Sequence, residues 1–235
     1  MKGTLFLIPT IISDAPYQDV LPQDILTTTN RVDEFIVENI KTTRRYLRKI
    51  GFKKDFDQIP YHSLNKHTKP EEIPSFLKAL NEGKNIGLFS EAGIPCIADP
   101  GAIVVKIAQQ NNHHIKPLVG PSSILLSLMA SGFNGQNFAF NGYLPIESKE
   151  RNQKIKALET RVYHEDQTQI FIETPYRNDK LLKAFLDNCR NETLICVATE
   201  ITSENEKIIT RSVKQWKKNL PALHKQNTVF LMYKG

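Results

Sequence analysis

A loop rich in glycine and proline, residues 90–101 with the sequence SEAGIPCIADPG, has the composition of a ligand-binding turn. Glycine permits backbone angles that other residues avoid and proline fixes φ, so Gly93 and Pro95 favour a stiff loop with an exposed backbone. Such a loop suits an adenine or a ribose that is recognised through main-chain N–H and C=O groups. The alternative is a plain connection into a helix, because Asp99 and Pro100 are typical of an N-cap and a first helical residue.

A second candidate loop, VGPSS at residues 119–123, leads directly into an apolar segment that is predicted to be helical. Free amide groups and the hydroxyls of Ser122 and Ser123 at a helix start favour a carboxylate or a phosphate. Most helices begin with such a cap, so this motif is a weak signal by itself. Together with the loop at residues 90–101, it is a moderate signal for a ligand site.

A basic segment, residues 41–54 with the sequence KTTRRYLRKIGFKK, contains seven Lys or Arg and no acid. On a helix, four of these cations fall at i, i+3, i+4 and i+7 and form one stripe. They are Lys41, Arg44, Arg45 and Arg48. The opposite side is predicted to be buried, and it carries Thr43, Tyr46, Leu47 and Ile50. The stripe is either a solvated surface or, since no carboxylate is interspersed, a site for a phosphate backbone.

The segment FIETPYR, residues 171–177, places Glu173 four residues before Arg177. Thr174 and Pro175 between them are typical of a cap and a first helical residue. Glu173 and Arg177 can form a structural ion pair or part of a substrate pocket, and the residues alone favour the structural pair.

Several common motifs are absent from the sequence. It has no GxGxxG after the first predicted strand, no GxxxxGK[ST] and no GxSxG. The glycine-rich loop of the commonest methyltransferase fold is also missing, since LFLIPTIISDAP has no glycine. Cys96, Cys189 and Cys196 form no CxxC, and the His residues show no metal-ligand spacing, so we expect neither a disulfide framework nor a metal site.

Short apolar runs alternate with helical segments along the chain. Strands are predicted at residues 4–8, 34–38, 86–89, 115–119, 138–141, 169–173, 194–199 and 228–233. Helices are predicted at residues 22–30, 42–50, 70–81, 101–111, 122–131, 149–159, 178–188 and 213–219. This alternation indicates α/β layers, with some antiparallel content near the end of the chain. We expect two α/β domains, residues 1–117 and 118–235, that divide near PLVGP.

The predicted order of elements places several loops at one edge of a sheet. In open α/β sheets, ligands bind beyond the carboxyl ends of parallel strands. The loops at that edge are residues 9–16, 39–41, 90–101 and 119–123. The two candidate loops and the start of the basic segment are therefore expected to lie near one another.

The chain has 235 residues, a net charge of +6 and a pI near 9.1. A moderately basic protein is compatible with a polyanionic partner, but the charge alone does not establish one. No apolar run approaches the ~18 residues of a membrane span. The segment MKGTLFLIPTIISD is interpreted as a first strand and not as a signal peptide, because its apolar run is short and broken by Pro9. A cytoplasmic protein with reduced cysteines is expected.

The motifs GTLFLIPT, SEAGIPCIADPG, LVGPSS, FNGYLP, ETPYR and ATEIT together resemble the tetrapyrrole methylase superfamily. The resemblance is strongest to its ribosomal RNA branch, which methylates the 2′-hydroxyl of a cytidine in 16S rRNA. It runs over nearly the whole chain, in order and at matching spacing. We call residues 90–101 the central loop. Its family form is S-D-A-G-T-P-G-I-S-D-P-G, and this chain matches that form at eight positions: Ser90, Ala92, Gly93, Pro95, Ile97, Asp99, Pro100 and Gly101.

The resemblance implies two α/β domains of the class III methyltransferase type, with S-adenosylmethionine in the cleft between them, and a homodimer. It also implies ribosomal RNA or the small ribosomal subunit as the partner, and no metal. Carried over position by position, the cofactor residues come from the first loop, the central loop, the helix start at GPSS and the second domain. They are Pro9, Glu91, Ala92, Gly93, Ile94, Pro95, Ile97, Ala98, Ser122, Ser123, Phe140 and Gly142.

Two segments depart from the family pattern. The first loop, T-P-I-G-N-L in the family, reads PTIISDAP, and the family's E-D-T-R reads Glu38-Asn39-Ile40-Lys41. In the family both segments flank the substrate entrance. The aspartate at the second position of the family's central loop is replaced by Glu91. The family's E-S-P-H-R reads ETPYR in this chain. The cofactor loop is thus largely retained, which supports methyl transfer more strongly than it supports one particular acceptor.

The resemblance also suggests roles in catalysis. A 2′-hydroxyl is a poor nucleophile unless a base takes its proton. Glu38 is the candidate base or orienting group, and Lys41 is the candidate to hold a phosphate or stabilise the alkoxide. The alternatives are a tetrapyrrole or protein acceptor, or a diverged paralogue that binds S-adenosylmethionine or RNA without turnover. The basic stripe favours RNA, because a tetrapyrrole pocket needs a more apolar lining than four exposed cations.

Overall fold

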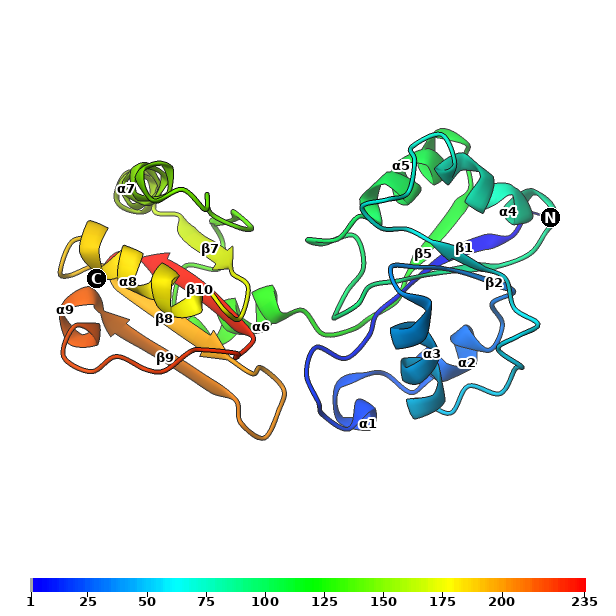
Figure 1. The fold of residues 1–235 in the computed structure, drawn as a ribbon, viewed down its shortest axis with the longest axis horizontal. Helices are drawn as coiled ribbons and strands as arrows, with labels where there is room; N and C mark the ends of the chain where they lie inside the picture. The colour runs from blue at the N-terminus through cyan, green and yellow to red at the C-terminus, as the bar shows by residue number, and fades with distance from the viewer. Residues whose placement is uncertain (1) are drawn as a thin grey trace. The chain divides into compact units, whose positions relative to one another are not determined.

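The computed structural model describes residues 2–235 and divides the chain into two compact units, Met1–Ser122 and Ser123–Gly235 (Figure 1). Each unit is built on one five-stranded sheet with helices packed on it, which confirms the predicted α/β class. The units divide after Ser122 and not after Pro117, because the connecting residues stay on the first unit. The amide of Leu118 donates to the Leu7 carbonyl over 3.0 Å, and the Leu118 side chain packs on the first unit's core.

The sheet of the first unit is entirely parallel. Its strands are β1 (Thr4–Ile8), β2 (Glu34–Val37), β3 (Tyr61–Ser63), β4 (Ile86–Phe89) and β5 (His114–Pro117), in the order β3-β2-β4-β1-β5. Leu5 of β1 lies opposite Ile86 on one side and Ile115 on the other. All four residues of β4 are buried, as expected for an interior strand covered on both faces.

Helices cover both faces of this sheet (Figure 1). One face carries α1 (Tyr17–Val20), α2 (Asp24–Thr29) and α3 (Ile40–Lys49), and the other carries the 3₁₀ turn η1 (Ile73–Leu77), α4 (Lys78–Asn81) and α5 (Ala102–Gln110). Two buried clusters fill the interfaces. Ile25, Phe35 and Leu47 belong to the first, and Ile36 and Val104 belong to the second.

The second unit has a mixed sheet. Its elements are α6 (Ser123–Ser131), β6 (Phe138–Phe140), α7 (Ser148–Glu165), β7 (Thr168–Ile172), α8 (Asn178–Asn188), β8 (Leu194–Thr199), β9 (Lys207–Ser212), α9 (Val213–Trp216) and β10 (Thr228–Tyr233). The strand order is β6-β7-β10-β8-β9. Only β6 and β7 pair in parallel, and the other pairs are antiparallel. The predicted antiparallel content near the end of the chain is therefore confirmed.

A single aromatic-rich core holds the second unit together. The Phe185 ring packs on Phe171 and Phe230, with ring centroids 5.1 and 5.9 Å apart. Trp216 is buried and its indole N–H donates to the Ile195 carbonyl over 2.9 Å. The buried indole therefore has a hydrogen-bond partner, which avoids the cost of burying an unpaired donor.

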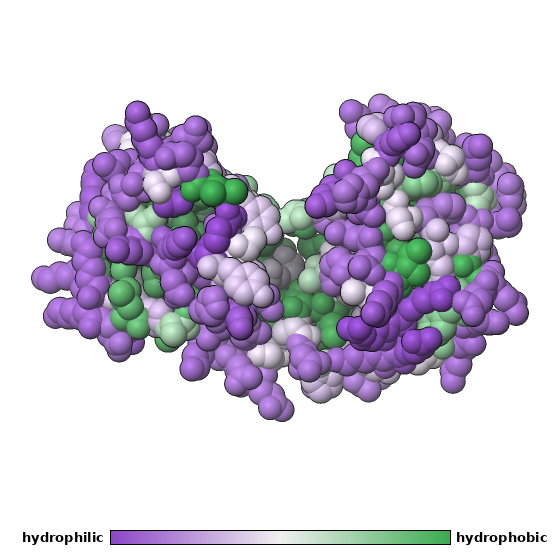
Figure 2. All heavy atoms as spheres, in the orientation of Figure 1, coloured by the Kyte–Doolittle hydropathy of each residue, from purple (hydrophilic) through white to green (hydrophobic). Residues whose placement is uncertain are grey.

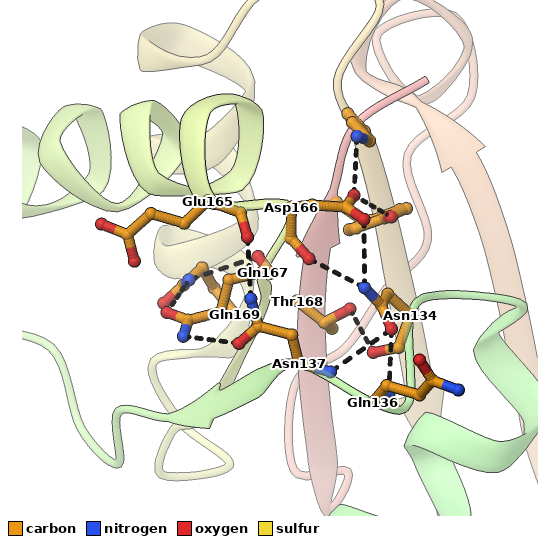
Figure 3. A network of polar contacts seen from close by, with 10 residues as sticks. Asn134, Gln136, Asn137, Glu165, Asp166, Gln167, Thr168 and Gln169 are labelled. Atoms are coloured by element: carbon orange, nitrogen blue, oxygen red, sulfur yellow. Dashed lines mark hydrogen bonds and ion pairs between the residues drawn. The ribbon is translucent and has the colours of Figure 1, made fainter.

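A polar network ties the turn before β6 to the turn between α7 and β7 (Figure 3). The Asn134 amide donates to the carbonyl of Asp166 and to its carboxylate, over 2.9 and 3.2 Å. Asp166 has a positive φ of 52° at the end of α7, and its carboxylate also pairs with Lys234 at 2.6 Å. Gln167 and Thr168 donate to Asn137 Oδ1 and to the Asn134 carbonyl. The network sets where β6 begins, and so supports the loop that follows that strand.

Some predicted elements differ from the observed ones. Strands β3 and β9 were not predicted, since both lie at sheet edges and contain polar residues. The predicted helix 149–159 extends to Glu165, because Leu158 and Val162 continue its buried face. The predicted helix 70–81 is a 3₁₀ turn followed by α4, with a proline in the first turn of η1. Proline cannot donate a backbone hydrogen bond, so it favours an interrupted helix there.

The visible surface of each unit is largely hydrophilic in the space-filling view of Figure 2. Most of the buried apolar side chains are gathered in three clusters of the two units. Within residues 2–235, no helix is both long and apolar enough to span a membrane.

Candidate active site

Four loops of the first unit follow the carboxyl ends of parallel strands, as the sequence predicts. They come after β1, β2, β4 and β5, and β4 and β1 are adjacent in the centre of the sheet. The amide of Thr10 in the first loop donates to the Gly93 carbonyl in the central loop over 2.9 Å. The first and central loops are therefore joined directly.

The central loop, residues 90–101, is held by its own side chains. The Ser90 hydroxyl donates to the Ala92 carbonyl over 3.0 Å. The Asp99 carboxylate accepts hydrogen bonds from the amides of Cys96 and Gly101, at 2.9 and 2.7 Å. Helix α5 begins at Ala102 with Gly101 as its N-cap, so the predicted N-cap role of Asp99 is wrong. Its carboxylate closes the turn before the helix instead, because the turn brings the Cys96 amide within reach.

The backbone of the central loop adopts conformations that L-residues rarely take. Gly93 has φ +73°, and a Cβ built on it would lie 2.9 Å from Ile12 Cγ2 and 3.0 Å from the Pro121 carbonyl oxygen. Cys96 and Ala98 also have positive φ, at 70° and 61°. Such strain costs of order 1–3 kcal/mol per residue and clusters at functional sites. The loop is therefore shaped by the fold and is not a relaxed connection.

The predicted cofactor residues are divided between the two units. The first unit contributes Pro9, Glu91, Ala92, Gly93, Ile94, Pro95, Ile97, Ala98 and Ser122, all at the carboxyl edge of its sheet. In the second unit, Ser123 begins α6, Phe140 ends β6, and Gly142 follows with φ +63°. The Gly142 carbonyl accepts from the Ile172 amide, which holds this loop beside β7. A shared cofactor cleft between the units stays a prediction.

Glu38 lies between the end of β2 and the start of α3, close to two other carboxylates. Burial raises the pKa of its carboxyl, and the nearby Asp99 and Glu91 carboxylates raise it further. Asn39 next to it is the N-cap of α3 and accepts from the amides of Lys41 and Thr42. A carboxylate with a raised pKa is a stronger base, so the environment of Glu38 suits proton transfer.

A cavity of about 260 Å³ opens at this edge, between the first loop, α3 and the start of the central loop. Its lining residues are Thr10, Ile11, Asp14, Thr42, Thr43, Arg45, Tyr46, Lys49, Ser90 and Glu91. The Thr42 hydroxyl donates to Glu91 Oε1 over 2.8 Å, and the Tyr46 hydroxyl donates to the Pro9 carbonyl over 3.1 Å. These bonds join the helix to both loops.

Helix α3 buries the side that the sequence predicts, with Thr43, Leu47 and Ile50 buried and Tyr46 half-buried. Its four predicted RNA contacts are not equivalent. Lys41, Arg45 and Arg48 are exposed, but the Arg48 guanidinium lies over the Phe56 ring at 5.0 Å. Arg44 is engaged by the fold, since it pairs with Asp57 at 3.0 Å and donates to the Phe56 carbonyl at 2.9 Å.

Lys49 and Thr42 line the cavity but were not predicted as site residues. The signal for them was present, because Thr42, Arg45, Tyr46 and Lys49 also fall at i, i+3, i+4 and i+7. The stripe with more cations, Lys41, Arg44, Arg45 and Arg48, shares only Arg45 with the cavity-lining face. The number of cations on a helix face therefore does not identify the face that lines the cavity.

Arg44 is expected to matter for stability more than for binding. Arg44→Ala removes the ion pair, the bond to the carbonyl and the contact with the Tyr61 ring at 5.0 Å. We expect a loss of about 1–2 kcal/mol in the free energy of unfolding, measured by urea titration. Arg45→Ala on the same helix removes no such contact and should change stability by less than about 0.5 kcal/mol. Equal losses in the two variants would contradict this role.

The Glu173–Arg177 pair is structural, as the residues alone suggested. Arg177 pairs with Glu173 at 2.6 Å, and the Thr174 amide donates to the same carboxylate oxygen at 2.6 Å. The Glu173 side chain is only 5% exposed. Burial of a paired carboxylate fixes the loop that follows β7.

Sequence comparison places most of the chain in a known family. The family model of Tetrapyrrole (Corrin/Porphyrin) Methylases matches residues 23–216. The chain is 32% identical over 213 residues to Ribosomal RNA small subunit methyltransferase I of Bacillus subtilis (strain 168). This match covers 91% of this chain and 68% of that protein. It is 31% identical over 214 residues to the protein of the same name from Haemophilus influenzae (strain ATCC 51907 / DSM 11121 / KW20 / Rd). That match covers 91% of this chain and 71% of that protein.

Solved structures share the fold. The methyltransferase CobJ matches with a TM-score of 0.64 at 13% identity, over 100% of this chain and 95% of that chain. The cobalamin biosynthetic enzyme cobalt precorrin-4 methyltransferase, CbiF, matches with a TM-score of 0.60 at 15% identity, over 98% and 94%. At these identities the likeness shows the fold alone.

The two α/β units and the loops at the edge of the first sheet define a class of enzyme, the S-adenosylmethionine-dependent methyltransferases. The family match extends over most of the chain and into both units. The chain belongs to the tetrapyrrole methylase family, and S-adenosylmethionine is its methyl donor.

The central loop fits this cofactor. Among the described residues, no group accepts a hydrogen bond from the amides of Gly93, Ile94 or Ala98, so these donors are unpaired; Gly93 is buried, Ile94 is half-buried and Ala98 is exposed. Burial, together with the nearby Asp99 carboxylate, raises the pKa of the Cys96 thiol to about 12. The thiol is therefore protonated at neutral pH and does not compete as a nucleophile for the methyl group.

Proposed function

We propose that this methyltransferase acts on a ribose 2′-hydroxyl of small-subunit ribosomal RNA. The observation that carries the proposal is that the central loop and the basic helix α3 meet at one sheet edge, where Thr42 donates to Glu91 over 2.8 Å. A methyl-donor loop and a cationic surface are thus adjacent. The relatives named Ribosomal RNA small subunit methyltransferase I, which match 91% of this chain, support RNA as the acceptor.

In this proposal, the predicted cofactor residues of both units bind S-adenosylmethionine. When bound, S-adenosylmethionine would supply an electrophilic methyl carbon, because the sulfur that carries it is positively charged and leaves as a neutral thioether. Pro9 contributes from the first loop, and residues 91–95, 97 and 98 of the central loop form the floor and bind through their unpaired amides. Ser122 and Ser123 bind the polar end at the start of α6, and Phe140 and Gly142 complete the site from the second unit.

Glu38 takes the proton of the attacking hydroxyl at its carboxylate. Its raised pKa supports this role, because a base is most effective when its pKa is closer to the working pH. Lys41, in the first turn of α3, holds a phosphate of the acceptor or stabilises the alkoxide. The remaining contribution is the positioning of the hydroxyl in line with the methyl group, which can supply several kcal/mol.

The exposed side chains of Lys41, Arg45 and Arg48 support contact with an RNA backbone. Arg44, which the sequence groups with them, serves the fold. Phosphate contacts of this kind supply affinity without sequence information, since they do not contact the bases.

We also propose that the protein is a cytoplasmic homodimer. A ribosomal acceptor supports the cytoplasm as its location. Helix α6 carries exposed apolar side chains, with Met129 79% and Leu125 45% exposed, and such side chains are suited to an interface between two copies. Light scattering should report twice the mass of one chain, and a monomer at micromolar concentration would contradict the dimer.

Two measurements test the proposed function. Calorimetry of the full chain should detect S-adenosylmethionine binding, and absence of binding by folded protein would contradict the cofactor site. Unmodified small ribosomal subunits should then be incubated with the enzyme and labelled cofactor. We expect the label on a ribose 2′-oxygen of the rRNA. Label on another acceptor, or no turnover despite cofactor binding, would reject the proposed acceptor.

A further inference from the structure

The cavity beside α3 has few hydrogen-bond donors left for a ligand. Five hydroxyl groups line it, and each donates to a protein carbonyl or carboxylate. They belong to Thr10, Thr42, Thr43, Tyr46 and Ser90. The other side-chain donors in the wall are the cationic groups of Arg45 and Lys49. A cavity whose hydroxyl groups already have acceptors and whose other side-chain donors are cations is suited to an anion.

Arg45 differs from the other arginines of α3. Arg44 is paired with Asp57, and Arg48 stacks on Phe56. Within residues 2–235, no hydrogen bond, ion pair or ring contact is formed by the Arg45 guanidinium, which lines the cavity. A guanidinium binds phosphate through two parallel N–H bonds, so a free one in a cavity wall favours that ligand.

Lys49 is held only weakly by its present partner. Its ammonium donates to Asp14 Oδ1 over 3.0 Å and to the Ala15 carbonyl over 3.2 Å. The Asp14 carboxylate is fully exposed, and exposed ion pairs contribute only about 0–1 kcal/mol. A phosphate can therefore replace Asp14 at Lys49 at little cost.

We propose that Arg45 and Lys49 bind one backbone phosphate of the acceptor RNA in this cavity, next to the central loop. The proposal rests on the proposed function. Glu91, the second carboxylate in the wall, accepts from Thr42 and lies on the loop side, and Asp14 is exchanged for the phosphate. The cavity of about 260 Å³ is slightly smaller than the ~300–1,000 Å³ of drug-sized ligand sites and suits a sugar phosphate. The bound phosphate then sets which ribose reaches the methyl group.

The test compares Arg45→Gln with Arg31→Gln, which removes the same charge from an exposed arginine before β2, at the opposite edge of the sheet. Small-subunit methylation and subunit binding are measured against salt concentration, and S-adenosylmethionine binding is measured by calorimetry. We expect Arg45→Gln to raise KM about tenfold and to lower the slope of log K against log salt by about 0.7–0.9, the value for one phosphate. Arg31→Gln should change neither, and both variants should bind the cofactor normally.

The outcomes separate this inference from the proposed function. If the wild-type enzyme methylates rRNA and Arg45→Gln behaves as Arg31→Gln does, the phosphate site is wrong and the function stands. If the wild-type enzyme labels no rRNA, both are overturned. Arg45→Lys retains the charge, so it should recover most of the salt slope while losing part of the affinity. Loss of the slope in Arg45→Lys would also contradict a phosphate contact.

Discussion

Replacing Glu38 with glutamine is expected to lower turnover about a hundredfold or more without unfolding the protein. A positioned general base typically contributes 10²–10⁴-fold to a rate, and glutamine cannot accept the proton. Turnover of small ribosomal subunits is measured at saturating cofactor. Glu204→Gln is the matched control, because Glu204 is exposed in the turn before β9. Wild-type turnover in Glu38→Gln would exclude Glu38 as the base.

Glu38→Gln should not lower the free energy of unfolding at pH 7, although it lowers turnover. Folding raises the pKa of Glu38 above its ordinary value of 4.5 through burial and through Asp99 and Glu91. The native state therefore holds this proton more tightly than the unfolded chain. The resulting stabilisation is present below the unfolded pKa and is lost as the pH rises through the folded pKa. Glutamine stays neutral throughout, so Glu38→Gln should be at least as stable as the wild type at pH 7.

The pH dependence of the rate gives an independent readout. In the wild type, kcat/KM should fall as the pH is lowered through the raised Glu38 pKa, because protonation removes the base. Glu38→Gln should lack this acid limb in its residual activity. An unchanged acid limb in the variant would assign the titration to another group.

Gly93→Ala is expected to weaken S-adenosylmethionine binding at least tenfold and to destabilise the first unit by about 1–3 kcal/mol. Gly93 has φ +73°, and a Cβ would lie 2.9 Å from Ile12 Cγ2 and 3.0 Å from the Pro121 carbonyl oxygen. An L-residue is strained in that conformation, and the backbone carbonyl of Pro121 has little room to move. The central loop must shift, and the unpaired amides of Gly93 and Ile94 shift with it.

Calorimetry and urea unfolding together test this prediction. Gly135→Ala is the control, because a Cβ at Gly135 meets no atom within 4 Å. It should change stability by less than about 0.5 kcal/mol and leave cofactor binding unchanged. If Gly93→Ala lost stability but kept full cofactor affinity, the central loop would be a structural connection and not part of the cofactor site.

The strands that the sequence predicted best are the apolar ones. The predicted bounds of β1, β4, β8 and β10 agree with the structure residue for residue. Apolar runs of this kind are set by burial, which a local pattern records. The edge strands β3 and β9 were missed because half or more of their residues are polar and their pairing partners lie far along the chain. Pairing with a distant strand leaves little signal in a short polar segment.

The sequence by itself determined the α/β class, the central loop and its family, because local composition and ordered motifs carry that information. Only the tertiary structure decided which cations are available and which carboxylate is perturbed. Asp57 reaches Arg44, and Asp14 reaches Lys49, from outside the helix. Asp99 and Glu91 reach Glu38 from the loop after another strand. Helical periodicity specifies the face on which a side chain lies, whereas its partners depend on the strand order that brings distant loops to one edge.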